Sequence, residues 1–104
     1  MGALQTFERM LAGGKDSALL RYSLGTEYMK AGDPARACEH LARAVELDAG
    51  YTAAWKLLGR ALAAAERRDE ALGAYRRGIE VARAKGDRQA EKEMMVFARR
   101  LERG

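Results

Sequence analysis

The sequence is poor in the residues that disulfides, metal sites and turns require. Its 104 residues include one cysteine, one histidine and one proline. A single cysteine cannot form an internal disulfide. No window approaches the roughly 18 consecutive apolar residues that a membrane-spanning helix needs, and residues 1–8 lack the basic segment and apolar run of a secretory signal. These absences favour a cytoplasmic protein that does not enter a membrane.

Residues suited to catalysis are also scarce. Cys38 and His40 are two positions apart and would point to different faces of a helix, which makes them a poor metal-binding or nucleophile–base pair. The Gly13-Gly14 pair lacks the preceding strand and the following Gly-Lys-Ser/Thr of a phosphate-binding loop. We therefore predict no enzymatic activity, no metal and no cofactor. Cys38 is predicted to be a small core residue and His40 a surface residue.

The composition fits a soluble, helix-rich chain with an uneven charge. Apolar residues make up 48% and charged residues 33%, and the net charge is +4. Residues 1–50 carry six basic and seven acidic side chains (−1), whereas residues 51–104 carry thirteen and eight (+5). The basic half indicates either an acidic partner or simply a well-solvated surface.

One pattern of residues occurs twice at a fixed interval. Leu24-Gly25 precedes Leu58-Gly59 by 34 residues (59 − 25 = 34), and the same interval separates Ala37 from Ala71 and Leu41 from Tyr75. A period of this length indicates one supersecondary unit that is copied and stacked. Subtracting 34 from Ala37 and Leu41 gives Ala3 and Phe7, so residues 3–12 match the second half of a further unit.

Apolar spacing and capping residues predict helices throughout the chain. Asp16 or Ser17, Asp33 before Pro34, Asp69 and Gly86-Asp87 are the expected start or stop signals. Gly25 and Gly59 are expected to let a neighbouring helix approach closely, and Trp55 is expected to be a large buried anchor. The predicted helices cover 3–12, 17–31, 34–47, 52–66, 70–84 and 88–102.

These residues resemble the tetratricopeptide repeat, whose signature is W-x2-L-G-x2-Y, then A-x3-F, then P. The second copy has Trp55, Leu58, Gly59, Ala71 and Tyr75; the first has Leu24, Gly25, Tyr28, Ala37 and Leu41. The closing proline is absent from both. The resemblance implies an all-α fold in which antiparallel helical hairpins stack as a short right-handed superhelical solenoid. We predict a single domain over 1–104, with an N-terminal helix at 3–12, repeats at 17–49 and 51–85, and a capping helix at 87–103.

In this family the first helices of successive repeats line a concave face that binds an extended peptide or a partner helix. The resemblance therefore implies a protein–protein interaction scaffold with a protein or peptide partner. Lys56 and Arg60 lie four residues apart and could jointly bind a carboxylate, or they could form an ordinary solvated helix face. The predicted groove residues are Tyr22, Thr26, Met29, Lys30, Lys56 and Arg60.

The last predicted helix offers a second hypothesis. Met94 to Ala98 are five consecutive apolar residues, which go completely round a helix, so at least one must be exposed. That exposure indicates either one ordinary surface valine or a self-associating structural module, natural or designed. The candidate residues for a homo-oligomer interface are Met95, Val96 and Arg99. Nucleic-acid binding is disfavoured, because five acids interrupt the basic tail and no aromatic-studded basic surface is evident.

Overall fold

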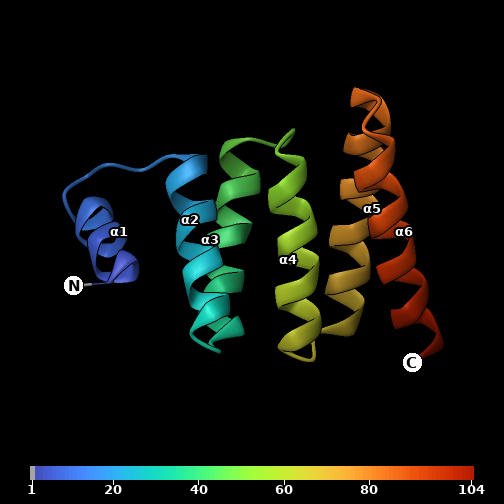
Figure 1. Cartoon of the computed structure of the whole chain (residues 1–104), viewed down its shortest axis with the longest axis horizontal. Helices are drawn as coiled ribbons and strands as arrows, with labels where there is room; N and C mark the ends of the chain where they lie inside the picture. Colours follow the sequence, from blue (N-terminus) through green and yellow to red (C-terminus); the bar gives the residue numbers. More distant parts are fainter. Residues whose placement is uncertain (1) are drawn as a thin grey trace.

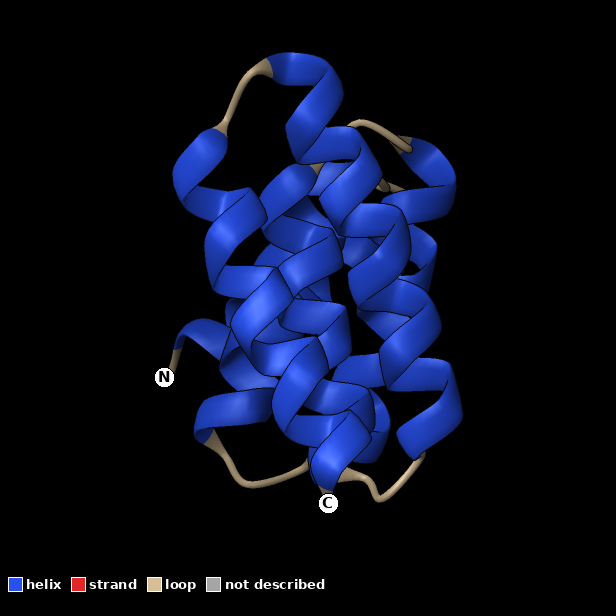
Figure 2. Cartoon of the chain, turned by 90° about the vertical axis from the view of Figure 1, so that its right-hand side faces the viewer, coloured by secondary structure: helices blue, strands red, loops and turns tan. Residues whose placement is uncertain are grey.

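The computed structural model describes residues 2–104, which form six helices in a single stack (Figure 1). Successive helices run antiparallel, and the connections gather at the two ends of the stack (Figure 2). The described chain contains no strand and measures 40 × 28 × 18 Å. The helices are α1 (Ala3–Ala12), α2 (Ala18–Lys30), α3 (Pro34–Leu47), α4 (Thr52–Ala64), α5 (Arg68–Lys85) and α6 (Arg88–Arg103).

Most helix ends carry the capping residues that the sequence indicates. The Ser17 hydroxyl accepts a hydrogen bond from the Leu20 amide (3.1 Å), and Asp33 and Asp87 accept equivalent bonds at the starts of α3 and α6. Positive φ angles follow α1, α2 and α5 at glycines, and Gly86 closes α5 in the left-handed region (φ 72°).

The predicted Asp69 cap is wrong. The residue before α5 is Arg67, whose side chain makes no capping bond, and Asp69 lies inside the first turn. Its negative charge there still complements the positive end of the helix dipole. The helix begins two residues earlier than predicted, after a turn in which Glu66 adopts a left-handed conformation (φ 61°).

The recurring glycines bring the two helices of each hairpin close together. A Cβ atom at Gly25 would overlap the Leu41 side chain, and one at Gly59 would overlap the Tyr75 ring. The predicted packing role of both glycines is therefore confirmed. Gly78 does the same for α6: a Cβ there would lie 2.5 Å from the Met94 sulfur and 2.9 Å from the Trp55 Cβ.

The core follows the stripe that the repeat predicts, with one difference at Trp55. Leu24, Leu41 and Met94 are fully buried, and Cys38 is buried as predicted. Trp55 is only half-buried. Its indole N–H donates to the Ala49 carbonyl (2.8 Å) in the connection just before the N-terminus of α4. An indole with a polar N–H commonly takes such a half-exposed position, because that group needs a hydrogen-bond partner.

The helix α6 occupies the place of a further first helix, with a register shifted by two residues. The interval from the start of α2 to that of α4 is 34 residues, and from α4 to α6 it is 36 (88 − 52 = 36). With these intervals the buried positions of α2, α4 and α6 coincide: Leu20, Ala54 and Ala90; Leu24, Leu58 and Met94; Tyr28, Leu62 and Ala98. We refer to α2, α4 and α6 together as the first-helix row.

The prediction that His40 is a surface residue is wrong. Its ring stacks on Tyr28 (centroids 5.4 Å apart), and its side chain is only 13% exposed because α1 covers it. The Arg21 guanidinium can only donate, so His40 Nδ1 accepts its bond (3.2 Å) and Nε2 carries the proton. That nitrogen faces Glu8 Oε1 at 3.6 Å, a buried oxygen that has no hydrogen-bond partner among the described residues.

Acid is expected to weaken the folded protein at this junction. Burial lowers the pKa of His40 from its usual 6.5, and the Glu8 carboxylate opposes that shift. The neutral ring is therefore favoured in the folded state. Its contribution to the free energy of unfolding is fully present above about pH 6.5 and is lost as the pH falls toward the folded-state pKa of His40. Urea unfolding midpoints of the wild type should fall between about pH 7 and about pH 5 more steeply than those of His40→Gln, which cannot titrate. Equal slopes for the two proteins would contradict this assignment.

Candidate functional site

The first-helix row leaves side chains free of the core, and hollows lie between its members. One hollow of about 350 Å³ separates α2 from α4. It contains four of the six predicted groove residues together with one leucine, and its lining is Thr26, Met29, Lys30, Leu57 and Arg60. The structure therefore brings residues from two repeats, about 30 positions apart in sequence, to one surface.

Some polar groups around this hollow already form hydrogen bonds or ion pairs within the chain, and others do not. The Thr26 hydroxyl donates to the Tyr22 carbonyl of its own helix (3.0 Å), and Lys30 pairs with Glu27 (3.2 Å). The Arg60 guanidinium makes no ion pair or hydrogen bond with any residue in the described part of the chain. Arg60 is therefore the cation that this hollow leaves available.

Tyr22 lies outside that hollow. Its ring contacts the Tyr51 ring at the start of α4, with centroids 5.1 Å apart. Burial raises the pKa of the Tyr51 hydroxyl above its usual value. The tyrosine pair fills the space between the first turns of α2 and α4, so Tyr22 borders the groove by packing rather than by an open side chain.

The expectation that Lys56 and Arg60 jointly bind a carboxylate needs correction. The Lys56 ammonium already pairs with the Glu93 carboxylate of α6 at 2.9 Å. Lys56 and Glu93 flank a separate hollow of about 230 Å³ between the first halves of α4 and α6. A strict 34-residue spacing puts Glu93 opposite Gly59, whereas the observed spacing of 36 puts it opposite Leu57, next to Lys56.

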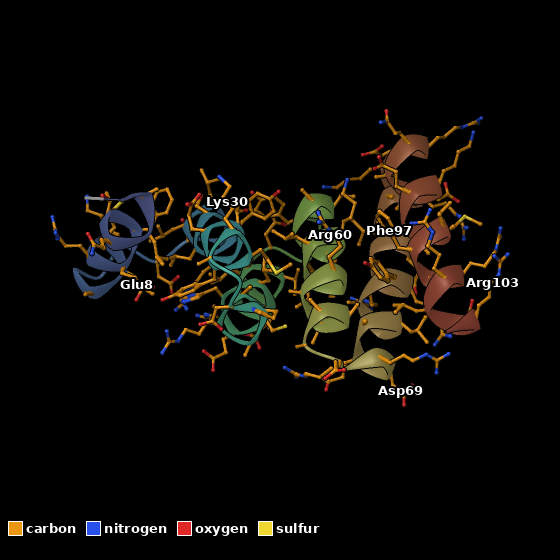
Figure 3. All side chains as sticks on the ribbon, turned by 60° about the horizontal axis from the view of Figure 1, so that its bottom comes forward. Glu8, Lys30, Arg60, Asp69, Phe97 and Arg103 are labelled. Carbon is orange, nitrogen blue, oxygen red and sulfur yellow. The ribbon has the colours of Figure 1, made fainter. Side chains whose placement is uncertain are left out.

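A third hollow, of about 270 Å³, lies between the second halves of α4 and α6. Arg60 borders both this hollow and the first one, so the two hollows lie on either side of its side chain. Figure 3 labels Arg60 on α4, near the middle of the stack, and Phe97 on α6, the last helix of the stack. The lining is Arg60, Ala63, Tyr75, Phe97, Arg100 and Leu101.

Several of these residues were not among the predicted site residues. Leu57, Tyr75, Phe97 and Arg100 carry no binding signal in the amino-acid sequence alone. The feature that could have revealed Phe97 and Arg100 is the two-residue shift of α6, which aligns them with Ala61 and Ala64 of α4. The predicted helix starts at 52 and 88 already contain this shift, but they do not show which side chains of α4 and α6 share a hollow.

The residues predicted for a homo-oligomer interface separate onto two sides of α6. Met95 is 38% exposed and Val96 is 43% exposed. With the 36-residue offset, Val96 and Arg99 align with Arg60 and Ala63, on the groove side of the row. Met95 aligns with Gly59, on the side against which a second helix packs in the other hairpins.

The described residues offer little to other classes of site. No group of three or more His, Cys, Asp or Glu side chains among residues 2–104 is placed to hold a metal ion. None of the described helices is both long enough and apolar enough to cross a membrane. Burial raises the pKa of the Cys38 thiol, so this cysteine stays protonated at neutral pH.

Comparison with known proteins agrees with the repeat architecture. The sequence profile described as tetratricopeptide repeat matches residues 28–90. The chain belongs to the tetratricopeptide repeat family. A relative from Pseudomonas aeruginosa strain PAO1, the TPR repeat-containing protein PA0015, is 52% identical over 100 residues, which is 96% of this chain and 95% of that protein. Tetratricopeptide repeat proteins generally mediate protein–protein interactions, and their fold is typically a non-catalytic scaffold.

Solved structures of tetratricopeptide repeat proteins share this arrangement. The solution structure of protein BPP2914 from Bordetella parapertussis has a TM-score of 0.84 and 39% identity, and the match covers 99% of this chain and 90% of that one. The crystal structure of YrrB, described as a TPR protein with an unusual peptide-binding site, has a TM-score of 0.73 and 30% identity over 95% of this chain and 58% of YrrB. The all-α helical repeat solenoid predicted from the sequence is therefore confirmed.

Proposed function

We propose that this protein is a cytoplasmic interaction scaffold that binds an extended peptide segment along its first-helix row. The observation that carries the proposal is that two hollows of the first-helix row flank the same side chain, Arg60. Their linings combine apolar side chains, which supply burial on binding, with a guanidinium that has no partner in the described chain. A repeat surface of this kind presents residues from successive units to one elongated ligand.

The proposal is tested by selecting peptides and locating where they bind. A phage-displayed library of random short peptides should yield ligands that shift the amide NMR signals of α2 and α4. Thr26→Glu places a bulkier, charged group in the first hollow and should weaken those ligands about tenfold or more. Ala42→Glu makes a comparable change at an exposed position of α3 and should leave binding unchanged.

Either of two results would reject the groove. The library could yield no ligand, or the selected peptides could shift the signals of α3 and α5 while binding Thr26→Glu as tightly as the wild type. Circular dichroism of both variants establishes that each remains folded.

Self-association is the second candidate, favoured by the exposure of Met95 and Val96 on α6. Light scattering across a range of concentrations should then show a mass above that of the 11.5 kDa chain, and Val96→Glu should return it to the monomer. A monomer at every concentration would exclude this candidate.

A further inference from the structure

The third hollow differs from the first in having an aromatic floor. Tyr75 and Phe97 lie side by side, with ring centroids 5.8 Å apart and planes inclined by 37°. The Tyr75 ring rests against Gly59 and is only 2% exposed, so it cannot move further inward. Ala63 and Leu101 add two more apolar side chains. Tyr75 therefore supports Phe97 from below, and the half-buried Phe97 ring is the aromatic surface that an apolar group of a ligand can reach.

The end of α6 that forms one wall of this hollow is fixed by a contact with α5. The Arg68 guanidinium donates to the carbonyls of Leu101 (2.6 Å) and Glu102 (3.0 Å). These bonds satisfy two carbonyls of the last turn, which otherwise have no partner within the helix. The wall is therefore held in place before a ligand arrives, which reduces the entropy lost on binding.

The rim of the hollow carries two cations that the described chain does not neutralise. Arg60 projects from α4 and Arg100 from α6, and neither guanidinium makes an ion pair or hydrogen bond with a described residue. Arg76 and Arg83 of the same half are paired with Glu102 and Glu91. Arg88, Arg99 and Arg103 also lack an ion pair with a described residue, so Arg60 and Arg100 are distinguished by their place in the lining of this hollow. No carboxylate is among the described residues that line the hollow.

Size limits what the hollow can hold. Pockets for whole small-molecule ligands usually have volumes of about 300–1,000 Å³, whereas this one has about 270 Å³. It therefore matches one large side chain of a longer ligand. Guanidinium groups favour carboxylates, which they can bind through two parallel hydrogen bonds.

We propose that this hollow is a specificity subsite for an acidic peptide segment. An aromatic or large aliphatic side chain would lie on Phe97, which Tyr75 supports from below, and carboxylates beside it would bind Arg60 and Arg100. This inference rests on the proposed function, since the rest of the same peptide continues past Arg60 into the hollow between α2 and α4. A nucleic acid could present rings and anionic phosphates to the same rim. The lining offers only two cations, fewer than the several phosphate contacts that nucleic-acid binding commonly uses, which favours the peptide.

The test uses a fluorescein-labelled peptide in which one phenylalanine is flanked by glutamates, with fluorescence anisotropy as the measurement. Arg60→Gln and Arg100→Gln should each weaken binding about tenfold, because each removes a charge-assisted contact. Arg77→Gln is the matched control: it removes an equal charge from an exposed position of α5 that lines neither hollow, and it should change affinity less than about twofold. Replacing the phenylalanine of the peptide with alanine should weaken binding about as much as either rim variant.

Other outcomes distinguish this subsite from the groove as a whole. If Arg60→Gln and Arg100→Gln bind the peptide like the wild type while Thr26→Glu does not, the subsite is wrong and the groove stands. If no peptide binds, both fail. If a fluorescein-labelled single-stranded oligonucleotide binds more tightly than the peptide and loses affinity in Arg60→Gln and Arg100→Gln, the acidic-peptide assignment is overturned.

Discussion

Met94→Ala is expected to lose about 2–5 kcal/mol of unfolding free energy, the usual range for truncating a fully buried methionine. Met94 is 0% exposed and lies over Gly78, where α6 meets α5. The surrounding helices are held by other contacts and cannot close the cavity completely. Since a small domain is stable by about 5–15 kcal/mol, the loss would be a large share of the total. Urea denaturation monitored by circular dichroism measures it directly.

The neighbouring methionine supplies the control. Met95 differs from Met94 only in position on the helix, and it is 38% exposed. Met95→Ala should therefore change stability by no more than about 0.5 kcal/mol. Amide hydrogen exchange should show α6 losing protection in Met94→Ala and keeping it in Met95→Ala. Equal effects of the two substitutions would contradict the assigned packing of α6.

Gly59→Ala is expected to destabilise the protein even though alanine is the better helix former. Alanine gains about 1 kcal/mol from helix propensity, but its Cβ would overlap three atoms of the Tyr75 ring. That ring is 2% exposed and packed against Phe97, so it cannot move aside. Overpacking of this kind typically costs about 1–3 kcal/mol, and an overlap with a rigid ring lies toward the upper end.

Gly73→Ala should have the opposite sign. Gly73 lies inside α5, and a Cβ atom added there would meet no other atom within 4 Å, so alanine should stabilise by about 0.5–1 kcal/mol. Thermal unfolding of the two variants should give a midpoint below the wild type for Gly59→Ala and above it for Gly73→Ala. A higher midpoint in both would mean that the hairpin does not depend on close contact at Gly59.

The fold was predictable because each hairpin carries a paired signal, a glycine on one helix and a large side chain on the other. Gly25 with Leu41 and Gly59 with Tyr75 indicate both the helices and their contact, and Asp33-Pro34 indicates a boundary. The two wrong predictions, the Asp69 cap and the exposure of His40, concern places where the local sequence is compatible with more than one structure. The left-handed turn at Glu66 starts α5 before Asp69, so Asp69 lies inside the helix. His40 is covered by α1, and the period that relates α1 to α3 through Ala3 and Phe7 does not show which α3 side chains α1 covers.

The candidate site was predictable in part for a related reason. Thr26, Met29 and Arg60 occupy non-core positions of helices whose register is clear, so their common surface follows from the period. Phe97 and Arg100 belong to a helix displaced by two residues, and their neighbours depend on the length of α5. The pairing of Lys56 with Glu93 also depends on the two-residue displacement of α6 relative to α4.

The Met95 side chain also limits how a further helical hairpin could be added to the stack after α6. In each complete hairpin a glycine of the first helix receives a large residue of the second, whereas α6 has Met95 at that place. A helix grafted after α6 to build another hairpin would meet the thioether before it reached the backbone. An extended array would therefore require Met95→Gly together with a leucine or tyrosine on the grafted helix.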